Sequence, residues 1–188
     1  MNLISKMVCD IKQGKPLDFS FNNLKTLSKL IDEKPKSLRV RGIPSRGPNK
    51  RFLCGTIWLN NNNLSNLTGL KDIVYELIEL PFYLYWLDVS FNEVTHINEE
   101  IFHFVNLQIL YLHGNNIKDM TEVSKLKKLL NLRSLTLYGN MISRIRHYRA
   151  YVLVYLPQIK KLDFTIITRE ERLAVSPAGT GTDVLVNF

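Results

Sequence analysis

Apolar residues and asparagine recur along the chain in a fixed order. Five blocks follow the pattern Leu-x-Leu-x-x-Asn-x-Leu, with Ile, Val or Phe at some leucine positions, and they span residues 17–24, 57–64, 87–94, 110–117 and 135–142. Because successive side chains of a strand point to opposite faces, the first two apolar positions of each block predict a short strand with one buried face. The asparagines follow one another at intervals of 40, 30, 23 and 25 residues, so the chain consists of repeating units.

The asparagine of each block stands where the unit must turn. A turn between packed coils leaves backbone N–H and C=O groups away from water, and those groups need hydrogen-bond partners. An asparagine side chain carries donors and acceptors, so it can serve its own coil and a neighbouring coil. We therefore expect a ladder of asparagines. Intervals of roughly 20 to 29 residues with this pattern are the signature of leucine-rich repeats.

The two longer intervals predict two different insertions. Within residues 69–80 the apolar positions follow helical spacing, and Pro81 would end that helix. Residues 34–51 hold seven Lys or Arg, no acid, three Pro and two Gly, which predicts a mobile basic loop between the first and second coils. Its cations are Lys34, Lys36, Arg39, Arg41, Arg46, Lys50 and Arg51.

The last unit departs from the pattern. Residues 148–156 have helical spacing, and a strand register with Ile159, Leu162 and Phe164 as its apolar positions follows. Ile167 takes the place of the next asparagine, so the ladder should end there, before a polar turn over 169–172. A stack of coils must cover its last apolar face, and an atypical terminal unit does so.

Composition excludes several classes of protein. Among 188 residues there are 29 Leu and 17 Asn, and 45% of the chain is hydrophobic, so it can bury a core and is not disordered. The apolar stretches are too short for a membrane span. Two cysteines make neither a disulfide framework nor a four-cysteine zinc site. The first residues lack a signal-peptide profile, so a reducing compartment such as the cytosol is expected by default.

The net charge of +8 comes almost entirely from residues 34–51, which contribute +7. Seven clustered cations can bind phosphates or an acidic protein surface. Nucleic-acid recognition normally adds stacking aromatics, which this segment lacks, so an acidic protein is favoured over RNA. A solvated loop with no partner explains the charge run equally well.

The strand register also predicts which side chains line the concave side of the stack. The residues between the two core positions are Asp18, Trp58, Asp88, Tyr111, Thr136 and Asp163. Neighbouring positions bring further aromatics to the same face, and strands about 4.8 Å apart make the rings contiguous. Exposed aromatic patches indicate a partner surface, although some rings can instead tuck under a terminal segment of this chain. The predicted docking face, called the concave aromatic face below, comprises Trp58, Trp86, Asp88, Phe91, Tyr111, His113 and Tyr138.

An enzyme is not predicted. Asp88, Ser90 and His113 are the residue types of a hydrolase triad, but the serine is not on a Gly-x-Ser-x-Gly elbow and no oxyanion donors are indicated. An open sheet offers no pocket that excludes water. The histidines lack metal-ligand spacing, and the glycines belong to repeat turns. We therefore predict no metal, no cofactor and no small-molecule substrate.

The ordered motifs resemble a known family. The repeat unit resembles the short cytoplasmic type of leucine-rich repeat found in phosphatase regulators and a spliceosomal adaptor. The segments LDFSF, IWLNNN, LDVSFNEVT, NLQILYLHGNNI and LRSLTLYGN resemble, in this order, one family of leucine-rich repeat proteins within that type. YRAYVLVYLPQIKKLDFTIITREER resembles the C-terminal cap of these proteins. The resemblance covers about residues 17–172 and includes a basic insertion after the first repeat. It implies an α/β solenoid with a parallel sheet on the concave face and short helices and turns on the convex face.

The resemblance also carries expectations about function. It implies a non-catalytic scaffold or adaptor, a protein-protein interaction module in a larger cytoplasmic assembly, with a link to cilia and to axonemal or microtubule-associated partners. An RNA–protein complex adaptor using the basic loop, and a phosphatase regulatory subunit, remain alternatives by fold-level analogy. The expected organisation is an N-terminal segment 1–16, a repeat domain 17–173 with a cap over about 146–173, and a flexible tail 174–188.

Overall fold

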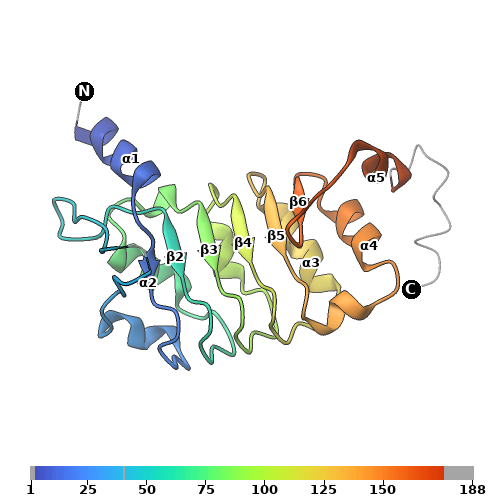
Figure 1. The fold of residues 1–188 in the computed structure, drawn as a ribbon, viewed down its shortest axis with the longest axis horizontal. Helices are drawn as coiled ribbons and strands as arrows, with labels where there is room; N and C mark the ends of the chain where they lie inside the picture. The colour runs from blue at the N-terminus through green and yellow to red at the C-terminus, as the bar shows by residue number, and fades with distance from the viewer. Residues whose placement is uncertain (1–2, 40, 176–188) are drawn as a thin grey trace.

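The computed structural model describes residues 3–39 and 41–175, which form a stack of coils around one sheet (Figure 1). The seven strands follow one another in chain order. They are β1 (Leu17–Asp18), β2 (Thr56–Trp58), β3 (Trp86–Asp88), β4 (Ile109–Tyr111), β5 (Ser134–Thr136), β6 (Lys161–Leu162) and β7 (Thr165–Ile166). Strands β1 to β6 are parallel, and β7 is antiparallel to β6. The predicted α/β leucine-rich repeat solenoid is confirmed.

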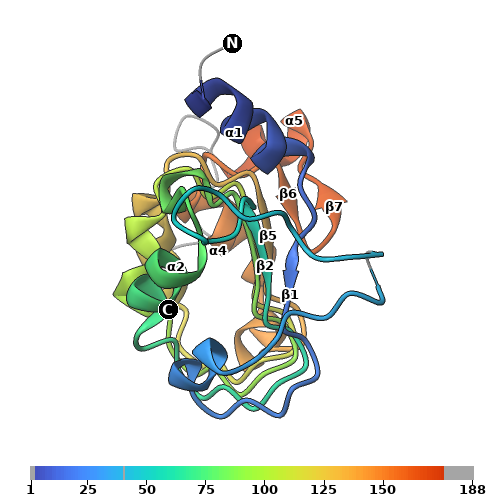
Figure 2. The ribbon, with the colours of Figure 1, turned by 90° about the vertical axis from the view of Figure 1, so that its left-hand side faces the viewer.

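The segments between the strands form short helices on one side of the sheet. They are η1 (Leu27–Ile31), α2 (Leu70–Leu77), η2 (Pro81–Tyr83), η3 (Glu99–His103), α3 (Thr121–Lys125), η4 (Leu126–Lys128), η5 (Met141–Arg144) and α4 (Tyr148–Tyr155). Helix α2 ends before Pro81, contrary to the prediction, because Ile78 leaves the helix and pairs with Phe52. Figure 2 shows α2 and α4 to the left of the strands, so the concave face is the sheet surface turned away from these helices.

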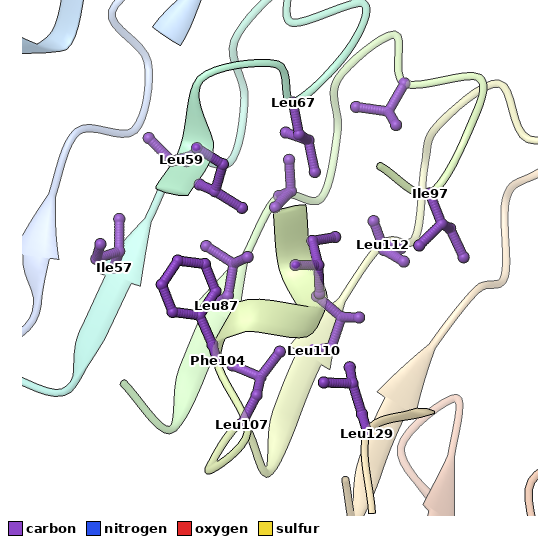
Figure 3. Close-up of a cluster of buried hydrophobic side chains, with 14 of the residues drawn as sticks. Ile57, Leu59, Leu67, Leu87, Ile97, Phe104, Leu107, Leu110, Leu112 and Leu129 are labelled. Atoms are coloured by element: carbon purple, nitrogen blue, oxygen red, sulfur yellow. The ribbon is translucent and has the colours of Figure 1, made fainter. Parts of the chain in front are cut away.

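The apolar positions of the blocks form the core (Figure 3). The side chains of Leu87, Leu110 and Leu112 are 0% exposed, and Phe104 and Leu129 reach them from the convex side. The first core position pairs across every parallel strand in one register, from Leu17 to Leu162. One continuous core therefore holds the strands that carry the concave face.

The asparagine ladder is present as predicted. Asn62 Oδ1 accepts from the backbone N–H groups of Asn22 and Leu24 at 2.9 and 3.1 Å, and its Nδ2 donates to the carbonyls of Phe19 and Leu59 at 3.0 and 2.9 Å. The asparagines of the next three coils repeat this arrangement, each against the coil before it. Each side chain thus satisfies the turns of two coils at once.

A second amide row, which the sequence did not indicate, lies at the opposite edge of the coils. Asn106 Nδ2 donates to the Phe82 carbonyl and Asn131 Nδ2 donates to the Val105 carbonyl, both at 3.0 Å. These asparagines directly precede Leu107 and Leu132, ahead of strands β4 and β5, where backbone carbonyls also need donors. Part of the asparagine excess therefore belongs to this second row.

The chain leaves the repeat pattern at Asp163. Asp163 and Phe164 have φ of 50° and 64°, which makes the tight turn between β6 and β7. Phe164 is 55% exposed, so the prediction that it occupies a core position was wrong. The Asp163 carboxylate accepts from the N–H groups of Leu137 and Tyr138 at 2.7 and 3.0 Å, so it satisfies the edge of β5 in place of a continuing strand.

Two further segments form helices that the sequence analysis did not predict. The expected polar turn over 169–172 is the start of helix α5 (Arg169–Ala174), which begins with a capping box between Thr168 and Glu171. The N-terminal segment contains helix α1 (Leu3–Gln13), whose Met7 and Ile11 pack against Leu53. The predicted flexible tail, residues 174–188, lies outside the described residues from position 176 onward.

The basic insertion is tied to the repeat body at several points. Lys36 N donates to the Asp18 carbonyl at 2.7 Å, and Asn49 Nδ2 donates to Glu79 Oε1 at 2.6 Å. The guanidinium of Arg46 lies 3.9 Å from the centre of the Phe52 ring. Figure 2 shows the first part of the insertion projecting from the sheet on the side away from the helices, where the β6–β7 hairpin also lies, whereas its last part returns toward helix α2.

Candidate docking surface on the concave face

The register of the parallel strands builds the candidate site. Trp58 pairs with Asp18 on one side and Asp88 on the other, and Asp88 pairs with Tyr111. Trp86 directly precedes the first core position of β3 and pairs with Thr56 of β2, so it lies beside these residues. The sheet therefore carries aromatic and acidic side chains in adjacent rows, as the alternation of core and surface positions predicts.

The rings of the concave aromatic face contact one another. Trp58 and Trp86 lie with their ring centres 5.6 Å apart in a T-shaped arrangement, and Trp86 and Tyr111 follow at 5.7 Å. His113 stacks on Tyr138 at 4.7 Å and meets the edge of Phe91 at 5.0 Å. These spacings are those of stabilising aromatic pairs, so the rings form one continuous layer. Tyr138 is 40% exposed and Phe91 50%, which leaves apolar surface open to a partner.

His113 lies beneath this layer. It is buried, and its Nδ1 is 2.7 Å from Thr136 Oγ1. Burial lowers the pKa of His113 below its ordinary value, although the charge of Asp88 acts in the opposite direction. The neutral ring therefore supports Tyr138 and Phe91 from below and offers little surface of its own.

Phe164 is a residue of this surface that the sequence did not indicate. From the β6–β7 turn its ring reaches Tyr111, His113 and Tyr138, with ring centres at 5.3, 5.6 and 6.0 Å. A hollow of about 360 Å³ lies beside it, bordered by Tyr111 and Lys161. The repeat register had assigned Phe164 to the core, and only the two positive φ angles of the turn bring it here.

The aspartates of the face are held by neighbouring hydroxyls. Asp88 Oδ1 accepts from the N–H and Oγ of Ser90 at 2.9 and 2.6 Å, and Asp18 bonds to Ser20 in the same way at 3.0 and 2.6 Å. Burial raises the pKa of Asp88, while the Ser90 bonds act in the opposite direction. Ser90 Oγ thus donates to Asp88, and the described Nδ1 contact of His113 is with Thr136.

The predicted basic residues fall into separate groups. Arg39 lies over Trp58, with its guanidinium 5.0 Å from the ring centre, and Lys36 Nζ donates to the carbonyls of Ser20 and Phe21. Arg46 instead stacks on Phe52, away from the concave face. The other four cations, Lys34, Arg41, Lys50 and Arg51, are exposed.

Metal and membrane sites find no support within the described part of the chain. Residues 3–39 and 41–175 contain no group of three or more His, Cys, Asp or Glu side chains placed to hold a metal ion. Their helices are also too short or too polar to cross a bilayer.

Comparisons with known proteins identify the class. Residues 54–179 match the leucine-rich repeat family model. In a crystal structure of the Drosophila melanogaster SNF/U2A' complex, a chain of the same fold superimposes with a TM-score of 0.64, at 23% identity over 93% of this chain and 88% of that chain. The chain is a leucine-rich repeat protein.

The sequence relatives narrow the family further. Leucine-rich repeat-containing protein 51 of Rattus norvegicus is 42% identical over 161 residues, which cover 85% of this chain and 82% of that protein. The Homo sapiens protein of the same name is 40% identical over 160 residues, with the same coverage. The U2 small nuclear ribonucleoprotein A' of Emericella nidulans is 29% identical over 140 residues, 68% of this chain and 61% of that protein. The chain therefore belongs to the family of leucine-rich repeat-containing protein 51.

Proposed function

We propose that the chain is a non-enzymatic scaffold or adaptor that docks a protein partner on its concave aromatic face. The observation that carries this proposal is the continuous layer of Trp58, Trp86, Tyr111 and Tyr138, whose rings are partly exposed on the sheet. Tryptophan and tyrosine are the residues most often found at interface hot spots. Contiguous aromatic surface of this kind marks interaction sites.

The two indoles support the proposal in a second way. Nε1 of Trp58 and Nε1 of Trp86 are buried and have no hydrogen-bond acceptor among the described residues. A buried donor without a partner costs free energy, and native structures rarely keep one. For a partner's backbone carbonyls to supply the acceptors, the indole rings would have to turn so that Nε1 becomes accessible.

The test is capture of partners from cell extract by the tagged full chain. A variant that combines Trp86→Ala with Tyr111→Ala should lose the specific partner, because two adjacent rings at the centre of the aromatic layer are removed. Tyr75→Ala is the matched control, since Tyr75 is 47% exposed on α2, on the convex side. Retention of every specific partner by a folded Trp86→Ala, Tyr111→Ala variant would overturn the proposal.

The proposal includes a cellular location. We propose a cytoplasmic assembly of motile cilia, with an axonemal or microtubule-associated partner, on the strength of the family resemblance. A tagged chain expressed in a ciliated cell should label the axoneme. A diffuse signal throughout the cell would refute the axonemal assignment.

An adaptor in an RNA–protein complex is the second candidate. The observation that favours it is the relative named U2 small nuclear ribonucleoprotein A'. This candidate predicts RNA binding that falls steeply with salt and disappears when the cations of 34–51 are neutralised. Absence of RNA binding at low salt would refute the RNA-adaptor candidate.

A phosphatase regulatory subunit is a third candidate, and only the likeness of the fold supports it.

A further inference from the structure

Arg39 enters the concave face from the basic insertion and lies beside the first aspartate. Its Nη1 donates to Ser20 Oγ at 3.2 Å and is 4.0 Å from Asp18 Oδ2. Its guanidinium lies 5.0 Å from the centre of the Trp58 ring. The Arg39 side chain is nevertheless 50% exposed, whereas that of Asp18 is 0% exposed. One cation of this chain thus covers a fully buried carboxylate.

The carboxylate beneath Arg39 is incompletely satisfied. Asp18 Oδ1 accepts both bonds from Ser20, but Oδ2 has no hydrogen-bond partner among the described residues. The 4.0 Å separation from Arg39 is too long for a hydrogen bond. Burying a carboxylate oxygen without a hydrogen-bond donor costs free energy. Asp18 Oδ2 therefore lacks one well-placed N–H donor.

A second acid and an indole complete the surroundings. Trp58 lies between Asp18 and Asp88 in the cross-strand row. Burial raises the pKa of Asp88, and the charge of Arg39 acts in the opposite direction. An indole face between two carboxylates attracts a cation, and a planar guanidinium both stacks on the ring and donates two bonds to a carboxylate.

We propose that Asp18, Trp58 and Asp88 form a site for an arginine side chain of the docking partner. In the unbound chain Arg39 occupies this site, and the partner's arginine displaces it. This inference rests on the proposed function, because it names the chemistry that the concave face recognises. A phosphate group would instead meet two carboxylates, so the site selects basic protein segments over nucleic acid.

Backbone hydrogen bonds hold the insertion on both sides of Arg39, so the Arg39 side chain can move while the insertion stays in place. Lys36 N remains bonded to the Asp18 carbonyl at 2.7 Å, and Gly42 N donates to the Ser37 carbonyl at 2.8 Å. Arg39 lies within the turn that this second bond closes. A half-exposed cation held by one ring and one hydroxyl is weakly bound, so it can be exchanged without unfolding the body.

The two tryptophans of the chain are Trp58 and Trp86, so intrinsic fluorescence reports this face directly. The probe is a capped peptide with one arginine between glycines, and its control carries glutamine in place of arginine. The proteins are the full chain as wild type, Arg39→Ala and Arg144→Ala. Arg144 is an exposed arginine of η5, so its variant removes the same charge elsewhere.

Arg39→Ala should bind the arginine peptide about tenfold more tightly than the wild type, which equals ~1.4 kcal/mol. Arg144→Ala should match the wild type, and the glutamine peptide should leave the fluorescence unchanged. Equal binding by Arg39→Ala and wild type, equal response to both peptides, or no response at all would each overturn the arginine site.

An Asp18→Asn change added to Arg39→Ala should abolish the peptide response. If circular dichroism shows that this variant does not fold, Asp88→Asn takes its place and should weaken binding at least threefold. An unchanged affinity in the folded variant would refute the acid site. Failure of the docking proposal would appear separately, as partner capture that is insensitive to Trp86→Ala and Tyr111→Ala.

Discussion

Replacing Asn115 by alanine removes a side chain that joins its own coil to the coil before it. Asn115 Oδ1 accepts from Val94 N at 2.9 Å, and Nδ2 donates to the carbonyls of Val89 and Leu112 at 3.0 and 2.9 Å. Asn115 is buried in the middle of the stack, where water does not replace these bonds. Each buried group left without a partner costs about 1–3 kcal/mol, so three of them predict a loss of at least ~3 kcal/mol.

Urea unfolding, followed by far-ultraviolet circular dichroism, measures this loss as a shift of the midpoint. The neighbouring Asn116 is exposed, so Asn116→Ala is the matched control and should change the free energy of unfolding by less than ~0.5 kcal/mol. A domain has about 5–15 kcal/mol of stability in total, so the difference between the two variants is large. Equal midpoints for the two variants would refute the role given to the ladder.

Three further changes have defined outcomes. Leu110→Ala should lower the free energy of unfolding by about 3–5 kcal/mol, because Leu110 is 0% exposed within the core; a loss below ~1 kcal/mol in urea unfolding would contradict this packing. The ion pair with Arg149 lowers the pKa of Glu171 from 4.5 to about 2, so its stabilisation is present above pH 4.5 and is lost as the pH falls toward about 2. Glu171→Gln should therefore lower the Tm by about 1–2 °C at neutral pH and by nothing near pH 2, and a difference independent of pH in calorimetry would argue against the pair. Phe164→Ala should leave the Tm within about 2 °C of the wild type, because the ring is 55% exposed, yet weaken partner capture; unchanged capture would remove Phe164 from the docking surface.

The repeat period made the core and the concave rows predictable. A strand has a side-chain period of two, and the aligned leucines and asparagines set the register of each strand against the next. The sequence alone therefore places Trp58, Trp86 and Tyr111 side by side, and the observed register and ring contacts agree. The ladder followed from the need of buried turns for hydrogen-bond partners.

The departures occur where local geometry overrides the period. Phe164 looks like a core residue in the repeat register, but Asp163 binds the edge of β5 and the chain turns there with positive φ. Arg39 belongs to an insertion without a repeat, so its contact with Trp58 depends on tertiary packing. Helix α1 had one signal, the spacing of Met7 and Ile11, which was too short a pattern to predict a helix.

The central claim is that a protein partner binds the concave aromatic face, and site-specific photo-crosslinking in living cells tests it most directly. A photoreactive phenylalanine analogue replaces either Tyr138, which is 40% exposed on the concave side, or Tyr75, which is 47% exposed on helix α2. The account predicts a discrete protein adduct from position 138 and none from position 75. Adducts of equal yield from both positions, or from position 75 alone, would contradict it.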